Sequence, residues 1–236
     1  MTQDDPTLSA PHGTPQAPRL TVRGEAHLEA DPELARIGIT ITARNTDRRT
    51  TLDDLTRRNA TTLDLIKSYG EAVEKLQTGA FSIAPEFTKH GRGERIRTYR
   101  GTVHLTTELT DFTALGELTT RLADLDLTRV DGPWWSLRPT SPVHAAARRQ
   151  AVHEAVRRAR EYADALGTTL AALVELADIG AEGHPARFDR AMVRMSAAGP
   201  YTDGIDDNPA TLDLEPERQE VHAAVNARFT LHPPTL

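Results

Sequence analysis

Apolar and polar residues alternate in several stretches of the chain, whereas in others apolar residues recur every three or four positions. Alternation predicts strands, and the longer period predicts amphipathic helices. Residues 20–28 and 37–41 both alternate and flank the turn signal Asp31-Pro32, so we expect them to pair as a hairpin. Gly24 predicts an irregularity in the first of these strands.

Residues 34–138 combine two helical patterns with four strand patterns. One helix is expected to begin after Asp47 and to end near Gly70, and a shorter helix to begin at Asp111. After the strand at 37–41, further strand patterns cover residues 73–83, 96–109 and 125–137. This order fits a ferredoxin-like βαββαβ segment with both helices on one face of an antiparallel sheet.

The last third of the chain predicts a long helix and two more strands. Ser141-Pro142 provides an N-cap and a first-turn proline, and Gly167 is placed to end the helix. Its expected apolar face consists of Val152, Val156, Ala159, Ala163 and Leu166. Residues 169–179 and 220–231 read as strands, separated by the loop 180–216, a length typical of functional or disordered connections.

Together these patterns predict an α+β fold with antiparallel sheet and three principal helices. Residues 1–18 hold four prolines and no apolar run, so we expect a disordered tail followed by one domain over 19–232. The same stretch lacks the basic start and apolar segment of a secretory signal, which favours a cytoplasmic location. No stretch approaches the roughly 20 apolar residues of a membrane span, so none is expected.

Composition restricts the chemistry that the chain can perform. A net charge of −6 gives no overall attraction for nucleic acids or anionic membranes. The absence of cysteine excludes disulfides, thiolate metal sites and a cysteine nucleophile. No GxSxG, Walker or Rossmann motif is present, so we expect neither a cofactor nor, on balance, an enzyme.

Two partial metal motifs remain unconvincing. His153-Glu154 begins a zinc-protease helix motif, but Arg157 occupies the position of the second histidine and would repel the metal. Asp203, Asp206, Asp207 and Asn208 suggest calcium, but they lack the EF-hand register. We therefore expect no bound metal, and the charged helix around Glu154 is more simply a solvated face with i,i+4 ion pairs.

Exposed aromatic and basic side chains suggest contacts with other proteins. Adjacent residues of a strand point to opposite faces, so of Trp134 and Trp135 one should pack in the core and the other remain available as an interface anchor. The arginine-rich helix has interspersed acids and no aromatic residues between its arginines, which favours a solvated face or a subunit contact over nucleic acid. The candidate interface residues are Trp134, Trp135, Arg149, Arg157 and Arg160.

Several short motifs occur in an order that resembles the SIMPL-domain family. They are Val22-Arg23-Gly24-Glu25, Asp31-Pro32-Glu33-Leu34-Ala35, Asn59, Gln77-Thr78-Gly79-Ala80-Phe81-Ser82-Ile83, Tyr99-Arg100-Gly101 and Ala163-Asp164-Ala165-Leu166-Gly167. The resemblance spans roughly residues 20–180 and a last strand near 217–231. Thr98 departs from the glycine that usually precedes the tyrosine, and the signal peptide of exported members is not seen.

The resemblance implies little about activity. Bacterial members of the family are commonly envelope proteins of unclear function, an animal member is an adaptor in kinase signalling, and no shared catalytic site carries over. We therefore expect a non-enzymatic, self-associating binding or scaffold protein that forms a homo-oligomer. The alternative is a small-molecule-binding protein or an unrecognised hydrolase with its site under the loop 180–216.

Overall fold

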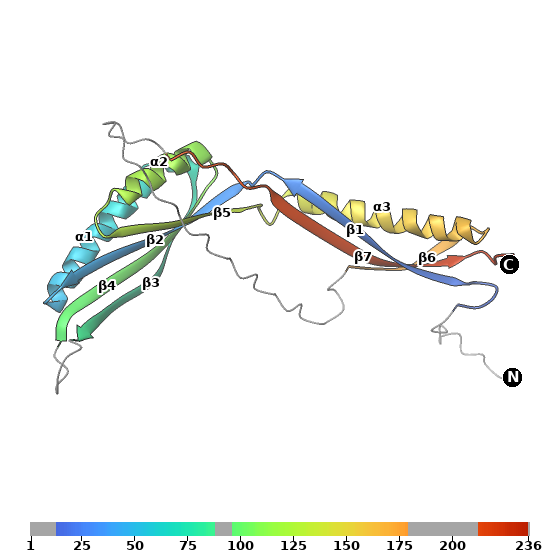
Figure 1. Cartoon of the computed structure of the whole chain (residues 1–236), viewed down its shortest axis with the longest axis horizontal. Coiled ribbons are helices and arrows are strands. Elements are labelled where there is room, and N and C mark those ends of the chain that lie inside the picture. Colours follow the sequence, from blue (N-terminus) through green and yellow to red (C-terminus); the bar gives the residue numbers. More distant parts are fainter. Residues whose placement is uncertain (1–12, 88–95, 179–211, 236) are drawn as a thin grey trace, which may run out of the picture. The chain divides into compact units, whose positions relative to one another are not determined.

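The computed structural model describes residues 13–87, 96–178 and 212–235. These residues form three α-helices and two antiparallel sheets, which confirms the predicted α+β class (Figure 1). Their contacts divide into two compact units. Unit 1 contains the two ends of the chain and residues 139–178, and unit 2 contains residues 31–138 and 212–219.

Unit 2 is a four-stranded sheet covered on one face by two helices (Figure 1). Its elements are β2 (Leu34–Asn45), α1 (Arg48–Lys67), the 3-10 turn Gly70–Ala72, β3 (Val73–Phe87), β4 (Ile96–Leu109), α2 (Phe112–Ala123) and β5 (Thr128–Ser136). The strand order is β3-β4-β2-β5, with antiparallel neighbours throughout. β4 thus lies between β2 and β3, and β2 lies between β4 and β5. The ferredoxin-like segment itself stays a prediction.

The helices of unit 2 begin at the expected caps. The side chain of Asp47 accepts a hydrogen bond from the Thr50 backbone N–H at 2.8 Å, and Asp111 accepts from Thr113 and Ala114. Beneath the helices, alternate residues of β2 are almost completely buried: Ile37, Ile39 and Ile41. The core between sheet and helices is completed chiefly by leucines of α1 and α2.

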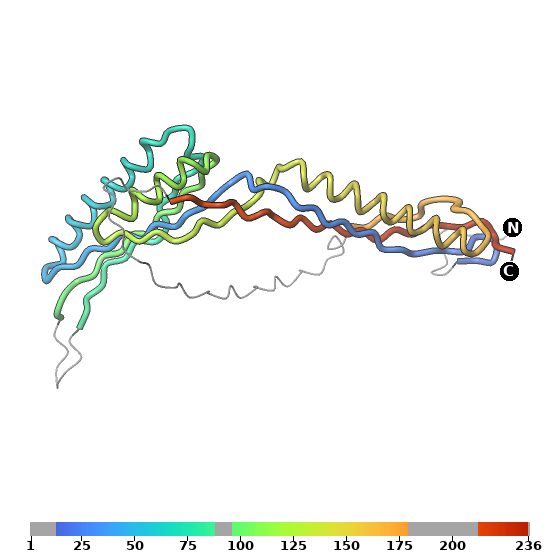
Figure 2. Tube along the Cα trace, turned by 45° about the horizontal axis from the view of Figure 1, so that its top comes forward, coloured from blue at the N-terminus to red at the C-terminus, as the bar shows by residue number. Residues whose placement is uncertain are grey.

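Unit 1 is a three-stranded sheet with one long helix. Its elements are β1 (Arg19–Ala30), α3 (Pro142–Ala165), β6 (Leu170–Asp178) and β7 (Gln219–Leu231), and the strand order is β1-β7-β6. The strands near the two chain ends run side by side (Figure 2). The Leu231 backbone N–H donates to the Pro18 carbonyl oxygen at 2.8 Å, which joins the start of β1 to the end of β7.

The predicted hairpin of residues 20–28 with 37–41 is wrong. β1 and β2 lie in different sheets: β1 pairs with β7, while β2 pairs with β4 and β5. Asp31-Pro32 instead stands where the chain passes from unit 1 to unit 2. A local turn signal cannot reveal that the better partner of a strand lies at the far end of the chain.

The buried face of α3 consists of small residues rather than the expected valines and leucine. It is formed by Ala147, Ala151, Ala155, Ala159 and Ala163. Val152 and Val156 lie beside this stripe, and Leu166 is 41% exposed. At Gly24 an added Cβ would lie only 2.0 Å from the Ala151 carbonyl oxygen, so the expected irregularity is a close crossing of helix and strand.

Some predictions fall outside the described residues. They concern the tail up to residue 12, residues 179–211 of the long loop and the calcium candidates Asp203, Asp206, Asp207 and Asn208. The domain bounds 19–232 stay a prediction. No α-helix within the described ranges is long and apolar enough to span a membrane.

Candidate interaction surfaces

The two tryptophans of β5 lie on opposite faces of the sheet of unit 2. Trp135 packs against the buried core, and its ring meets that of Phe112 edge-on with 4.8 Å between the ring centres. Trp134 is 48% exposed. β5 therefore presents one tryptophan to the core and leaves the other available to a partner, as strand alternation predicts.

The exposed ring of Trp134 is held by an arginine and lies beside two glycines. Trp134 is the register partner of Arg36 on β2, whose guanidinium carbon lies 5.5 Å from the centre of the ring. A Cβ at Gly38 would touch the ring at 3.5 Å, and one at Gly132 would approach it to 3.3 Å. The glycines keep the space beside the ring free, and the cation–π contact fixes its position.

Other polar side chains lie on the open face of the same sheet. The Thr40 hydroxyl and a His104 ring nitrogen are 3.0 Å apart, and Arg129 pairs with Asp131 at 2.6 Å. At one end of the sheet, Glu86 is held by Thr98 and by arginines 44 and 100. The hydrogen bond from Thr98, aided by these arginines, lowers the pKa of Glu86.

The arginines of α3 fall into two groups. Arg157 pairs with Glu154 at 2.6 Å and with Glu161, and Arg158 also reaches Glu154 at 3.3 Å. These contacts, led by the hydrogen bond from Arg157, lower the pKa of Glu154. Arg149 and Arg160 are exposed on the same helix. Glu154 is thus committed to ion pairs, as the solvated-face interpretation expects.

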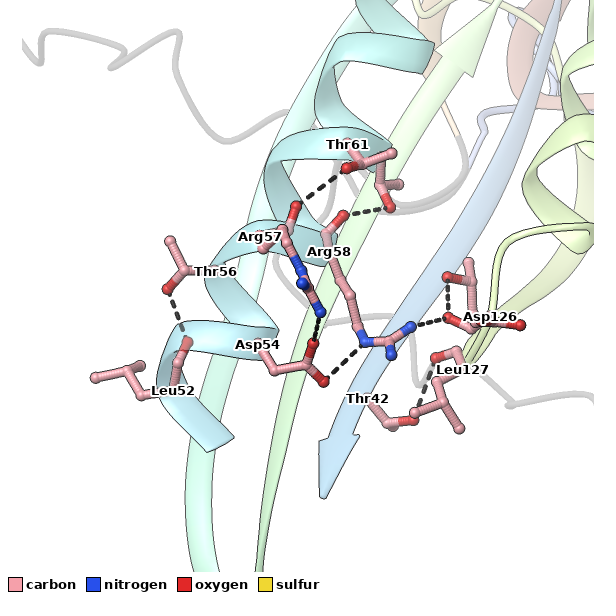
Figure 3. Close-up of polar contacts among 11 residues, drawn as sticks. Thr42, Leu52, Asp54, Thr56, Arg57, Arg58, Thr61, Asp126 and Leu127 are labelled. Carbon is pink, nitrogen blue, oxygen red and sulfur yellow. Dashed lines mark hydrogen bonds and ion pairs between the residues drawn. The ribbon is translucent and has the colours of Figure 1, made fainter. Parts of the chain in front are cut away.

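A second polar cluster lies between α1 and the turn before β5 (Figure 3). Arg58 donates from Nε to Asp54 at 3.0 Å and from Nη1 to the Asp126 carbonyl oxygen at 2.9 Å. The hydrogen bond from Arg58, followed by that from Arg57, lowers the pKa of Asp54. A hollow of about 270 Å³ beside the cluster is lined by both arginines and by threonines of α1. Sequence reasoning gave no signal for this cluster, because its partners lie far apart in the chain.

Sequence reasoning also missed an apolar strip on β6, one of the two outer strands of the sheet of unit 1. Leu173, Val174 and Leu176 are 54%, 46% and 46% exposed. We call these three residues the β6 strip. Leu173 pairs with Phe229 and Leu176 with Ala227, both buried beneath α3, so the two leucines share the helix-side face. They stay exposed because α3 packs mainly along β1 (Figure 1).

The described end of the long loop forms a hollow on unit 2. It has a volume of about 490 Å³ and is lined by Phe112, Thr113 and the stretch Leu212–Pro216, which includes Asp213 and Glu215. The Leu212 backbone N–H donates to the Thr120 hydroxyl at 3.2 Å, and Leu214 packs against the core. This end of the loop is therefore anchored along α2.

The two antiparallel sheets and three helices define an α+β protein of two units. Each unit exposes apolar side chains, Trp134 in one and the β6 strip in the other. The chain matches the model of the family described as SIMPL, protein of unknown function (DUF541), over residues 20–229. It belongs to the SIMPL family. The match covers elements of both units, so the family resemblance seen in the motifs is confirmed.

Two similar proteins are both called 26 kDa periplasmic immunogenic protein, one from Brucella melitensis biotype 1 and one from Brucella abortus (strain S19). Each is 28% identical over 200 residues, covering 79% of this chain and 77% of the relative. Their names point to the periplasm, so the expected cytoplasmic location is wrong. That expectation rested only on residues 1–18, and the lack of a recognisable signal there does not fix a compartment.

Proposed function

We propose that this protein is a periplasmic, non-enzymatic binding protein that acts as a self-associated assembly. The observation that carries the proposal is the β6 strip, in which three neighbouring apolar side chains are about half exposed. Burying such surface contributes roughly 25 cal/mol per Å² of apolar area. Clustered apolar exposure on an outer strand is typical of a contact surface rather than of a solvated one.

A second copy of the chain is the partner that best fits the β6 strip. Two β6 strands laid antiparallel about Val174 would place Val174 against its symmetry mate, Ala172 opposite Leu176 and Leu173 opposite Glu175. Glu175 does not oppose this contact, because Arg228 pairs with it at 2.6 Å from the neighbouring strand. Register shifts within β6 disfavour a regular backbone ladder, so side chains would make the contact.

The interface residues named from the sequence remain part of the proposal. Trp134 is exposed on the open face of unit 2, and Arg149 and Arg160 are exposed on α3. Arg157 forms ion pairs with Glu154 and Glu161, so it would contribute to an interface together with these two glutamates. Trp135 packs on the core, so of the two rings we propose Trp134 as the anchor.

Light scattering on the purified full chain tests self-association. The expected mass is a multiple of 25.9 kDa for the unmodified protein and a single chain for Val174→Lys, because a lysine on the outer strand opposes association. Leu52→Lys on α1 is the matched control, since Leu52 is 41% exposed, and it should leave the assembly intact. A single-chain mass at tens of micromolar would reject self-association. An assembly that survives Val174→Lys would reject the β6 strip as its interface.

The alternative function, a small-molecule site or hydrolase, is favoured by the hollow that contains Asp213 and Glu215. Two carboxylates in one hollow could serve a ligand or an acid–base pair. Turnover of a common ester or phosphate substrate that is lost in both Asp213→Asn and Glu215→Gln would support this alternative over the scaffold.

A further inference from the structure

Two histidine rings meet on the sheet of unit 1. His27 on β1 and His222 on β7 come from neighbouring strands, and both are exposed. Their ring centres are 4.5 Å apart, and the ring planes make an angle of 45°. Nearly the whole chain separates the two residues in sequence, so the pair exists only because β7 lies beside β1.

The pair lies on the open face of its sheet. Val22 and Ala26 on β1 are buried in the cluster that packs against α3, so strand alternation turns His27 to the other face. Of the carboxylates on this sheet, Glu25 pairs with Arg23 and Glu175 with Arg228, each at 2.6 Å. The two imidazoles are the metal-binding side chains that the structure brings into contact here.

The distance between the rings suits one shared metal ion. Two imidazoles bound at adjacent positions, each with its nitrogen about 2.0 Å from the metal, have ring centres roughly 4–5 Å apart. We propose that His27 and His222 chelate a late first-row divalent cation, with Cu²⁺ the strongest candidate because neutral imidazole suits it and it leads the affinity series.

Both rings are exposed, so water can supply the remaining ligands. The hollow of about 200 Å³ that His222 borders is lined by His144 and Arg148 of α3, so it lies on the helix side of the sheet and is not part of this site. Within the described residues no group of three or more His, Asp or Glu side chains could hold a metal, so water completes the shell. Such a site binds exchangeably rather than as a closed structural centre.

Titration with copper sulfate tests the proposal on the full chain, purified without a histidine tag in a non-coordinating buffer. We expect one saturable site with an electron paramagnetic resonance signal of two nitrogen ligands. His27→Ala and His222→Ala should each weaken binding at least about tenfold. His104→Ala and His153→Ala, at exposed histidines elsewhere, should bind as the unmodified protein does.

A second measurement does not depend on the variants folding. With substoichiometric Cu²⁺, nuclear magnetic resonance of the unmodified chain should broaden the imidazole signals of His27 and His222 together, ahead of other histidines. Broadening that falls first on other residues would overturn the proposal. So would unchanged binding in His27→Ala or His222→Ala, or the absence of a saturable site.

Discussion

Thr42 donates two hydrogen bonds to a single acceptor, the carbonyl oxygen of Leu127: one from its backbone N–H at 2.9 Å and one from its hydroxyl at 3.1 Å. Leu127 has a φ of 56°, a left-handed conformation that side-chain-bearing residues rarely adopt. Arg58 holds the preceding carbonyl, that of Asp126, at 2.9 Å. The turn before β5 is thus a strained backbone fixed by two neighbours.

Glycine at this position should relieve the strain. We expect Leu127→Gly to raise the free energy of unfolding by about 1 kcal/mol, because glycine adopts the left-handed conformation without a Cβ penalty. Leu127→Ala removes the same half-exposed side chain but keeps the Cβ, so it should bring no gain. Urea unfolding of the three proteins measures the difference, and equal effects of the two substitutions would contradict the strain.

The crossing of α3 over β1 leaves no room for a side chain at Gly24. Gly24→Ala would push its Cβ into the backbone of Ala151 and Ala155, so we expect a loss of about 1–3 kcal/mol or more and faster hydrogen exchange in α3. Gly79→Ala is the control, because the nearest atom to its added Cβ, the His104 carbonyl oxygen, lies at 3.4 Å. Similar losses for both variants would argue against the tight crossing.

Sequence patterns predicted most elements but not how the first and last strands pair. The caps at Asp47, Asp111 and Ser141 are local signals, and all three helices begin beside them. The partner of β1 lies about 200 residues away in the chain, and pairing at that range leaves no local trace. The α3 face was misjudged because large apolar residues mark a helix face more visibly than alanines do.

Two glycines of the recognisable family motifs are packing residues. Gly24 admits α3, and an added Cβ at Gly101 would lie 2.9 Å from the Leu55 side chain on α1. Such glycines identify a fold without identifying a ligand. The β6 strip and the histidine pair depend on strand neighbours from distant parts of the sequence, so neither could be assembled from the sequence alone.

The two tryptophans should differ sharply in their effect on stability. Trp135→Ala removes a ring from the core edge and its contact with Phe112, so we expect a loss of about 3 kcal/mol. Trp134→Ala loses mainly the contact with Arg36, worth about 0.5–1 kcal/mol at an exposed site. Denaturant unfolding followed by circular dichroism compares them, and a larger loss at Trp134 would reverse the assignment of faces.

The free energy of unfolding should depend on pH through the carboxyl group of Asp54. Its pKa is lowered from 3.8, chiefly by the hydrogen bond from Arg58, so its charge stabilises the folded state above the unfolded pKa. That contribution, up to about 1 kcal/mol for a partly exposed pair, disappears as the pH falls through the lowered pKa. Asp54→Asn does not titrate there, so its deficit relative to the unmodified protein should shrink towards about pH 2. A deficit that stays constant with pH would contradict this assignment.

The position of β7 between β1 and β6 has a consequence for how the protein is made. β7 follows both β1 and β6 in the sequence, so during synthesis these two strands have no backbone between them until β7 is made. The four strands of unit 2 are synthesised earlier, and none of them needs β7 as a neighbour. A chain cut before residue 219 would lose the centre of the first sheet while keeping every strand of the second, so the first sheet cannot be completed until β7 has been made.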